Sequence, residues 1–235
     1  PTLDSAEEYC FYIQKCFPVG QHRRQFFADL IRNAKPHHGY KLLSLLAEAG
    51  IVTSCWTTNF DCLIAKAATD YDVTPIEVGM DSQQRVFRQP RRGELLCISL
   101  HGDYRYDELK NTDNELQQQE SELQRALIKE LRDATLVVIG YSGRDSSLMK
   151  ALSEAYSQPG TGALYWCGYG DHIEEPVEDL IRTARGANRT AYFVPTHGFD
   201  DTLSRLAFHC LSDNRQEQAR QLLEVTKQDS DVCEP

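Results

Sequence analysis

Residues 135–156 read TLVVIGYSGRDSSLMKALSEAY and contain a strand, a tight turn and a helix in immediate succession. Residues 135–139 are β-branched or apolar, which is typical of a strand inside a sheet. Gly140 and Gly143 suit a turn that needs positive φ angles. Residues 147–156 then carry apolar side chains at helical spacing. A strand that passes directly into a helix predicts an α/β protein with a parallel sheet.

The same alternation continues on both sides of this segment. Further strands are predicted at residues 51–56, 75–78, 95–100, 163–167 and 191–194. Helices are predicted at residues 40–49, 61–68, 115–132, 176–184 and 199–211, after two helices within residues 5–34 that break at 18–20. This order predicts a doubly wound, mostly parallel sheet with helices on both faces. We expect one domain over residues 1–212 and a peripheral polar helix or tail over residues 213–235.

The composition is that of a globular protein. Of the 235 residues, 41% are apolar and 26% are charged, which excludes wholesale disorder. The 25 basic and 35 acidic side chains give a net charge of −10, a poor match for nucleic acid. No window approaches the ~20 apolar residues that span a bilayer, and the chain does not open with a signal segment. We expect a cytoplasmic protein without a membrane or nucleic-acid partner.

The eight cysteines are scattered and never form a C-x-x-C pair, which argues against a zinc ribbon or finger. Cys55, Cys97 and Cys167 lie in apolar strands, where a free thiol packs as a small hydrophobe. A disulfide framework is not expected in a chain of this length without an export signal.

Four polar clusters directly follow predicted strands. They are TTNFD at 57–61, HGD at 101–103, GYSGRD at 140–145 and GYGD at 168–171. In an open parallel sheet, ligands bind beyond the carboxyl ends of the strands, so these clusters are candidates for a binding site. Each also has a purely structural interpretation, because Thr58, Asn59, Asp61 or Asp145 can cap the helix that follows. The tandem His37 and His38 beside Pro36 are most simply interpreted as part of a loop.

Three of these clusters together resemble a known family. TTNFD at 57–61, LHGD at 100–103 and IGYSGRD at 139–145 occur in the order found in sirtuin-like (SIR2-like) domains, and they look most like the bacterial branch in antiphage defence proteins. The resemblance extends from about residue 40 to about residue 211, where Gly198-Phe199-Asp200 precedes a leucine-rich helix. It implies a Rossmann-like NAD-binding fold.

The resemblance also implies roles for individual residues. It makes Asn59 the residue that orients a water or the ribose, and His101 the catalytic base. Asp61 supports that site, and Thr58 belongs to the same cofactor-binding segment. The remaining contacts to phosphate and ribose are implied for Gly140, Tyr141 and Ser142.

These residue types suit cleavage of the bond between nicotinamide and ribose. That reaction releases a neutral leaving group from a cation-like sugar, as in other glycoside cleavages. A histidine with a pKa of about 6.5 can accept a proton near neutral pH. An amide can hold a water through a donor and an acceptor, and backbone N–H groups of a glycine-rich turn can bind phosphate.

Two departures from the family refine this expectation. Deacylating sirtuins carry a zinc module with two C-x-x-C pairs, which this sequence lacks. We therefore expect an NAD hydrolase with NAD as its substrate and no metal, in place of a lysine deacylase. The family's Gly-Ala-Gly-type loop has no match before Tyr40. Because the chain begins at Pro1 and its methionines are Met80 and Met149, we expect that loop upstream, in a longer protein.

As part of a defence protein, such a hydrolase would need control by homo-oligomer assembly or by an attached sensor region. Two alternatives remain open. One is a catalytically silent NAD-binding or assembly module of the same fold. The other is a metal-dependent hydrolase with Asp61, His101 and Asp103 as ligands. The basic group of Arg88, Arg91 and Arg92 is expected in a solvated loop.

Overall fold

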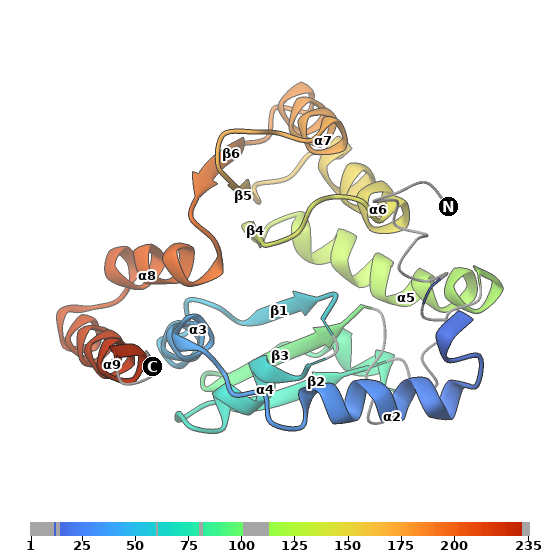
Figure 1. The fold of residues 1–235 in the computed structure, drawn as a ribbon. Coiled ribbons are helices and arrows are strands. Elements are labelled where there is room, and N and C mark those ends of the chain that lie inside the picture. Colours follow the sequence, from blue (N-terminus) through green and yellow to red (C-terminus); the bar gives the residue numbers. More distant parts are fainter. Residues whose placement is uncertain (1–11, 13–14, 60, 80–81, 101–112, 232–235) are drawn as a thin grey trace. The chain divides into compact units, whose positions relative to one another are not determined.

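A computed structural model describes residues 12, 15–59, 61–79, 82–100 and 113–231 (Figure 1). Within these ranges the strands pair in parallel and form two three-stranded sheets, in the orders β1-β3-β2 and β4-β5-β6. Helices flank both sheets, so the α/β fold class predicted from the sequence is confirmed. The chain divides into two compact units, one around each sheet.

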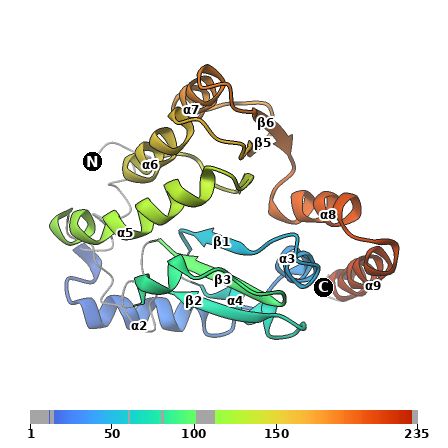
Figure 2. The same cartoon turned by 180° about the vertical axis from the view of Figure 1, so that it is seen from behind.

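The β1–β3 unit comprises residues 29–103 and 199–235. Its elements are α3 (His38–Glu48), β1 (Ser54–Thr57), α4 (Leu63–Ala68), β2 (Thr74–Val78), the short 3-10 helix η1 (Gln83–Phe87), β3 (Glu94–Ser99), α8 (Phe199–Cys210) and α9 (Asp213–Asp231). Strand β3 lies between β1 and β2, as Figure 2 shows. Its continuous apolar run, Leu95–Ile98, is buried, as predicted for a central parallel strand.

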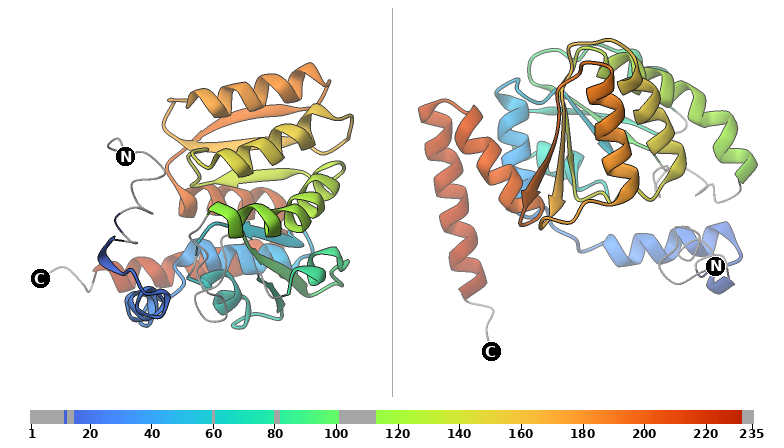
Figure 3. Two further views of the ribbon diagram at one scale, coloured as in Figure 1. Left: turned by 90° about the vertical axis from the view of Figure 1, so that its right-hand side faces the viewer. Right: turned by 90° about the horizontal axis from the view of Figure 1, so that it is seen from above.

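The β4–β6 unit comprises residues 1–28 and 104–198. Its elements are α5 (Asp113–Leu131), β4 (Leu136–Ile139), α6 (Ser146–Ser157), β5 (Leu164–Tyr169), α7 (Glu175–Gly186) and β6 (Ala191–Thr196). Helix α2 (Gly20–Ile31) crosses the boundary between the units. In Figure 3, α6 and α7 lie side by side along one face of the sheet. The fully buried side chains of this unit include Leu123, Tyr156, Leu164, Trp166 and Val177.

The largest difference from the predicted elements occurs before β1. A buried strand was expected from Ile51, whereas β1 begins at Ser54 and its four residues are only half-buried. The backbone N–H groups of Ile51 and Val52 both donate to the carbonyl of Leu46, at 3.0 and 3.3 Å. These bonds continue the turn that ends α3, where Gly50 adopts a φ of +76°. Ile51 and Val52 are therefore used to leave the helix, and contact with the sheet begins at Thr53, whose carbonyl accepts a hydrogen bond from the N–H of Leu96 at 3.0 Å.

Helix α9, predicted as an exposed polar helix, packs against α3 and α8 along its first half. Arg215 forms an ion pair of 2.9 Å with Glu48 of α3. The side-chain amide of Gln216 donates to the carbonyls of Phe208 and Leu211 at 3.0 and 2.9 Å. Ala219 is completely buried. These contacts attach the start of α9 to the rest of the β1–β3 unit.

The cysteines within the described residues are free thiols. Cys97 and Cys167 are buried, and Cys55 packs against the core around Cys97. Burial raises the pKa of the Cys97 thiol, with smaller contributions from Cys55 and Glu77. Among the described helices, we find none that combines the length and the apolar character needed to cross a membrane.

Candidate functional site

The segment that follows β1 forms a polar turn. The backbone N–H of Asn59 donates to Thr57 Oγ1 at 3.0 Å, and the N–H of Leu63 donates to Asp61 Oδ1 at 3.0 Å. The N-cap of α4 is Cys62, in the left-handed conformation at φ +53°, so Asp61 is not the N-cap that was considered; it satisfies the first N–H of the helix from the position before the cap. The turn leaves Asn59 exposed and Thr58 half-buried, beyond the carboxyl end of β1.

Strand β3 ends at the same edge of the sheet as β1. Thr57 lies opposite Ser99 in the parallel register, and the N–H of Leu100 donates to the Thr57 carbonyl at 2.9 Å. The chain therefore leaves β3 next to the end of β1. His101, the predicted base, and Asp103, the alternative metal ligand, lie outside the described residues.

In the β4–β6 unit, residues 140–145 form the turn expected after β4. Gly140 and Gly143 have φ values of +70° and +78°, which confirms their predicted conformational role. Asp145 is the N-cap of α6, since Oδ1 accepts hydrogen bonds from the N–H groups of Ser147 and Leu148 at 2.9 and 3.2 Å. The cap interpretation of Asp145 is therefore confirmed.

Tyr141 supports this turn from within. Its hydroxyl oxygen accepts a hydrogen bond from the Asp145 N–H at 3.2 Å, and its ring lies 5.8 Å from that of Trp166. Gly140 and Ser142 are exposed on either side of it. The turn thus presents backbone groups and the Ser142 side chain to solvent. The hydroxyl of Tyr141, in contrast, stabilises the turn through its hydrogen bond with Asp145.

The predicted site residues form two groups, each within its own unit. One group, in the β1–β3 unit, contains Thr58, Asn59 and Asp61. The other, in the β4–β6 unit, contains Gly140, Tyr141 and Ser142.

A known protein-family model matches a large part of this chain. The model of the SIR2-like domain matches residues 53–187, which is more than half of the chain. The chain belongs to the SIR2-like family. No curated protein matches it. SIR2-like domains use NAD as a substrate, so membership points to an NAD-dependent enzyme in general.

The SIR2-like segment includes every predicted site residue. Thr58, Asn59 and Asp61 lie near its start, His101 in its middle, and residues 140–142 in its second half. It does not include α3 or α8. A side chain of α3 nevertheless reaches the candidate site.

Tyr40 of α3 is the residue that the sequence analysis missed. Its hydroxyl forms hydrogen bonds with the side chains of Asn59 and Asp61. The phenol can donate to the Asp61 carboxylate, and its oxygen can accept from the Asn59 amide N–H. Asn59, although exposed, is therefore held by a neighbouring helix. A tyrosine on the packed side of a helix needs a hydrogen-bond partner for its hydroxyl. The position of Tyr40 among the apolar residues of α3 is therefore the sequence signal that could have identified it.

Burial raises the pKa of the Tyr40 hydroxyl to about 12, and the charge of Asp61 adds to the rise, while the hydrogen bond with Asn59 opposes it. Burial is also the main reason why the pKa values of Tyr141 and Tyr156 rise to about 12. All three phenols remain neutral at physiological pH, so Tyr40 can act there as a hydrogen-bond donor.

These shifts predict how stability depends on alkaline pH. Below pH 10, folded and unfolded chains both keep these protons, so the full stabilisation is present. Between about pH 10 and pH 12 the unfolded chain loses protons that the folded chain retains, and the free energy of unfolding falls. We expect the urea midpoint to decrease across this window, and to decrease less steeply in Tyr40→Phe. A midpoint that does not change between pH 9 and pH 12 would contradict the prediction.

Proposed function

We propose that this chain is an NAD hydrolase domain that cleaves NAD to nicotinamide and ADP-ribose. The observation that carries the proposal is the position of Asn59. Its amide stands beyond the end of β1, is held by Tyr40 and has Asp61 beside it. Membership of the SIR2-like family supports NAD as the substrate. The absence of any C-x-x-C pair from the sequence favours hydrolysis over zinc-containing lysine deacylation.

In the proposed reaction, a water attacks the ribose carbon that carries nicotinamide. The bond from this carbon to the ring nitrogen breaks, and its electron pair leaves with neutral nicotinamide. Asn59 orients the water or the ribose through its amide, and His101 accepts the proton of the water. The carboxylate of Asp61 supports the site by holding Tyr40 and by favouring positive charge on the sugar.

The turn at 140–142 is proposed to bind the phosphates and a ribose. Backbone N–H groups beside the positive φ of Gly140 can contact phosphate oxygens closely. The hydroxyl of Ser142 is exposed, and Tyr141 stiffens the turn between them. We assign the NAD contacts of this unit to Gly140, Tyr141 and Ser142.

The proposed setting is a larger antiphage defence protein, of which this domain is the cytoplasmic effector that depletes NAD. Uncontrolled loss of NAD would harm the cell that makes the protein. We therefore propose that the activity is controlled by homo-oligomer assembly or by a sensor domain or partner protein.

The experiment that tests the function is measurement of nicotinamide release from NAD by the longest natural chain that contains these residues. Release of nicotinamide and ADP-ribose in equal amounts is the expected result. Binding of NAD without release would favour the alternative, a catalytically silent NAD-binding module. Neither binding nor release would leave an assembly scaffold and would overturn the proposal.

A further inference from the structure

The start of α3 places two histidines next to each other. His38 is the first residue of the helix, and His37 precedes it with an extended backbone, at φ −73° and ψ 174°. The interpretation of this segment as a simple loop is therefore wrong for His38. The two rings lie with their centroids 4.4 Å apart.

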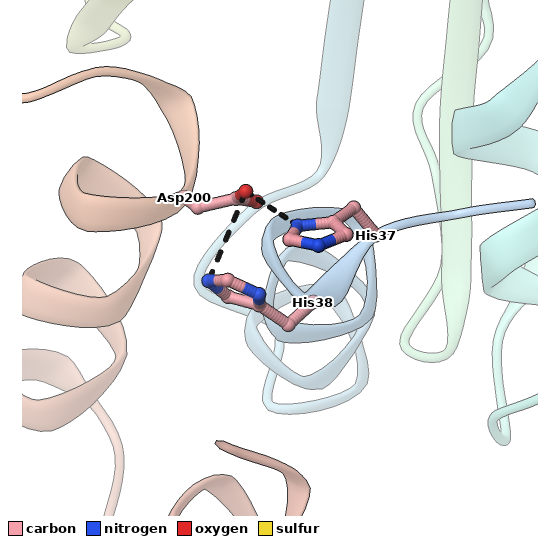
Figure 4. A group of neighbouring side chains, drawn as sticks. All are labelled: His37, His38 and Asp200. Carbon is pink, nitrogen blue, oxygen red and sulfur yellow. Dashed lines mark hydrogen bonds and ion pairs between the residues drawn. The ribbon is translucent and has the colours of Figure 1, made fainter. Parts of the chain in front are cut away.

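Asp200, in the first turn of α8, stands between the two rings (Figure 4). Its Oδ2 lies 2.5 Å from His37 Nδ1 and 3.8 Å from His38 Nε2. One ligand-type atom from each of the three residues lies within 4.8 Å of the others. Two imidazoles and one carboxylate thus converge from helices that are far apart in the sequence.

The backbone holds these groups in a fixed frame. The N–H of Gly39 donates to Asp200 Oδ1 at 2.8 Å, which orients the carboxylate and directs its other oxygen toward the imidazoles. A Cβ at Gly39 would lie 2.4 Å from Asp200 Oδ1 and 2.8 Å from the ring of Phe199, so only glycine allows this approach of α8 to α3. The rings of Tyr40 and Phe199 pack 4.8 Å apart beside it.

The spacing suits a transition-metal ion. Zinc binds imidazole nitrogen and carboxylate oxygen at about 2.0–2.2 Å, so two ligands of a tetrahedral site stand about 3.4 Å apart. The separations of 2.5 and 3.8 Å lie on either side of that value. Side-chain movements of about 1 Å bring all three atoms to ligand distance.

The orientation of His38 determines which of its ring nitrogens can reach an ion. Nε2 faces Asp200 Oδ2 at 3.8 Å, whereas Nδ1 is buried on the other side of the ring. Nε2 is therefore the nitrogen that His38 offers at this site.

We infer that His37, His38 and Asp200 bind a divalent transition-metal ion such as Zn²⁺, with three protein ligands and a remaining coordination position open to solvent. The His37 side chain is 61% exposed, which gives the ion an entry path. Two imidazoles and a carboxylate with an open position are the donor set of mononuclear zinc and iron sites. The ion would link α3 to α8 next to Tyr40.

The test is titration of the metal-free protein with Co²⁺, followed by competition with Zn²⁺, in a buffer with a non-thiol reductant. We expect one Co²⁺ per chain, visible absorption bands typical of four or five ligands, and displacement by Zn²⁺. The variants His38→Gln and Asp200→Asn should each bind at least about 10-fold more weakly. At a Zn²⁺ concentration 100 times the Kd, the unfolding equilibrium constant of the wild type should fall about 100-fold.

The matched control is His172→Gln, because His172 and Glu174 form another histidine–carboxylate pair, at 3.9 Å, without a second imidazole. It should bind Co²⁺ as the wild type does. His37→Gln, at an exposed position, is the variant to use if Asp200→Asn does not fold. Absence of binding, unchanged affinity in folded variants, or the charge-transfer absorption of cobalt–thiolate bonds would each overturn the inference. Because the readout is binding, the result does not depend on NAD cleavage.

Discussion

An Asn59→Ala variant is expected to release nicotinamide from NAD about 10³-fold more slowly than the wild type. The reason is positional: removal of one preorganised hydrogen-bonding group at a reacting centre costs about 10²–10³-fold in rate. The amide of Asn59 is preorganised by Tyr40, which fixes it at the end of β1. The rate of nicotinamide release by His101→Ala should be lower by about 10²–10⁴-fold, which is the usual contribution of a general base.

The two variants can be tested together. If Asn59 and His101 act on the same water, the rate of the double variant is reduced by much less than the product of the two single-variant reductions. Independent roles would give the full product. Initial rates of nicotinamide release measure both cases.

Suitable controls separate activity from folding. Asn33→Ala changes an exposed asparagine of the same unit, and His209→Gln changes an exposed histidine at the end of α8. Both should retain wild-type rates. Asn59 is exposed, so its truncation should cost only about 1 kcal/mol of stability, which urea denaturation can check. A fully active Asn59→Ala enzyme would exclude the assigned role.

The order of strands and helices could be predicted because each element carries its own pattern. Residues 95–98 form a continuous apolar run, and Leu42, Leu45 and Leu46 mark the buried side of α3. Caps are local as well: Asp145 bonds to N–H groups two and three residues away. Such signals lie entirely within a short window of sequence, so they can be recognised without knowledge of the tertiary contacts.

Contacts between distant segments are not encoded in this way. Asp200 meets His37 across 163 residues, and no local pattern pairs an aspartate in one helix with two histidines at the start of another. The hydrogen bonds of Tyr40 with Asn59 and Asp61 likewise form only after α3 has packed beside α4. The candidate site was therefore predicted from its strand-end residues, while the side chains that hold them became visible only in the folded chain.

Arg189 illustrates the same limit in the core. In the sequence it is the middle residue of Asn188-Arg189-Thr190, in a polar stretch before β6. In the fold only 4% of it is exposed. Its guanidinium donates to the carbonyl oxygens of Leu131, Ala155 at 3.0 Å and Gly162 at 2.6 and 3.1 Å. Leu131 and Ala155 lie in the last turns of α5 and α6, where helices leave carbonyls without partners, and Gly162 lies in the loop between α6 and β5.

An Arg189→Met variant is therefore expected to lose about 4 kcal/mol of stability, because each buried carbonyl left without a partner costs about 1–3 kcal/mol. The guanidinium also lies 4.2 Å from the centre of the Tyr156 ring, and this cation–π contact disappears as well. The stability of Arg189→Lys should lie between that of the wild type and that of Arg189→Met. The reason is that one ammonium group cannot reach all three carbonyls in the geometry of a guanidinium.

The matched control for this prediction is Arg185→Met. Arg185 is exposed and donates one hydrogen bond of 2.9 Å to the carbonyl of Ala191, so its loss should cost about 1 kcal/mol. Urea denaturation followed by tryptophan fluorescence in a Trp56→Phe background reports on the buried Trp166 of the same unit. If Arg189→Met and Arg185→Met have the same midpoint, the carbonyl contacts of Arg189 do not contribute the stability that their burial implies. A separation of about 3 kcal/mol means that this one side chain holds together the ends of two helices.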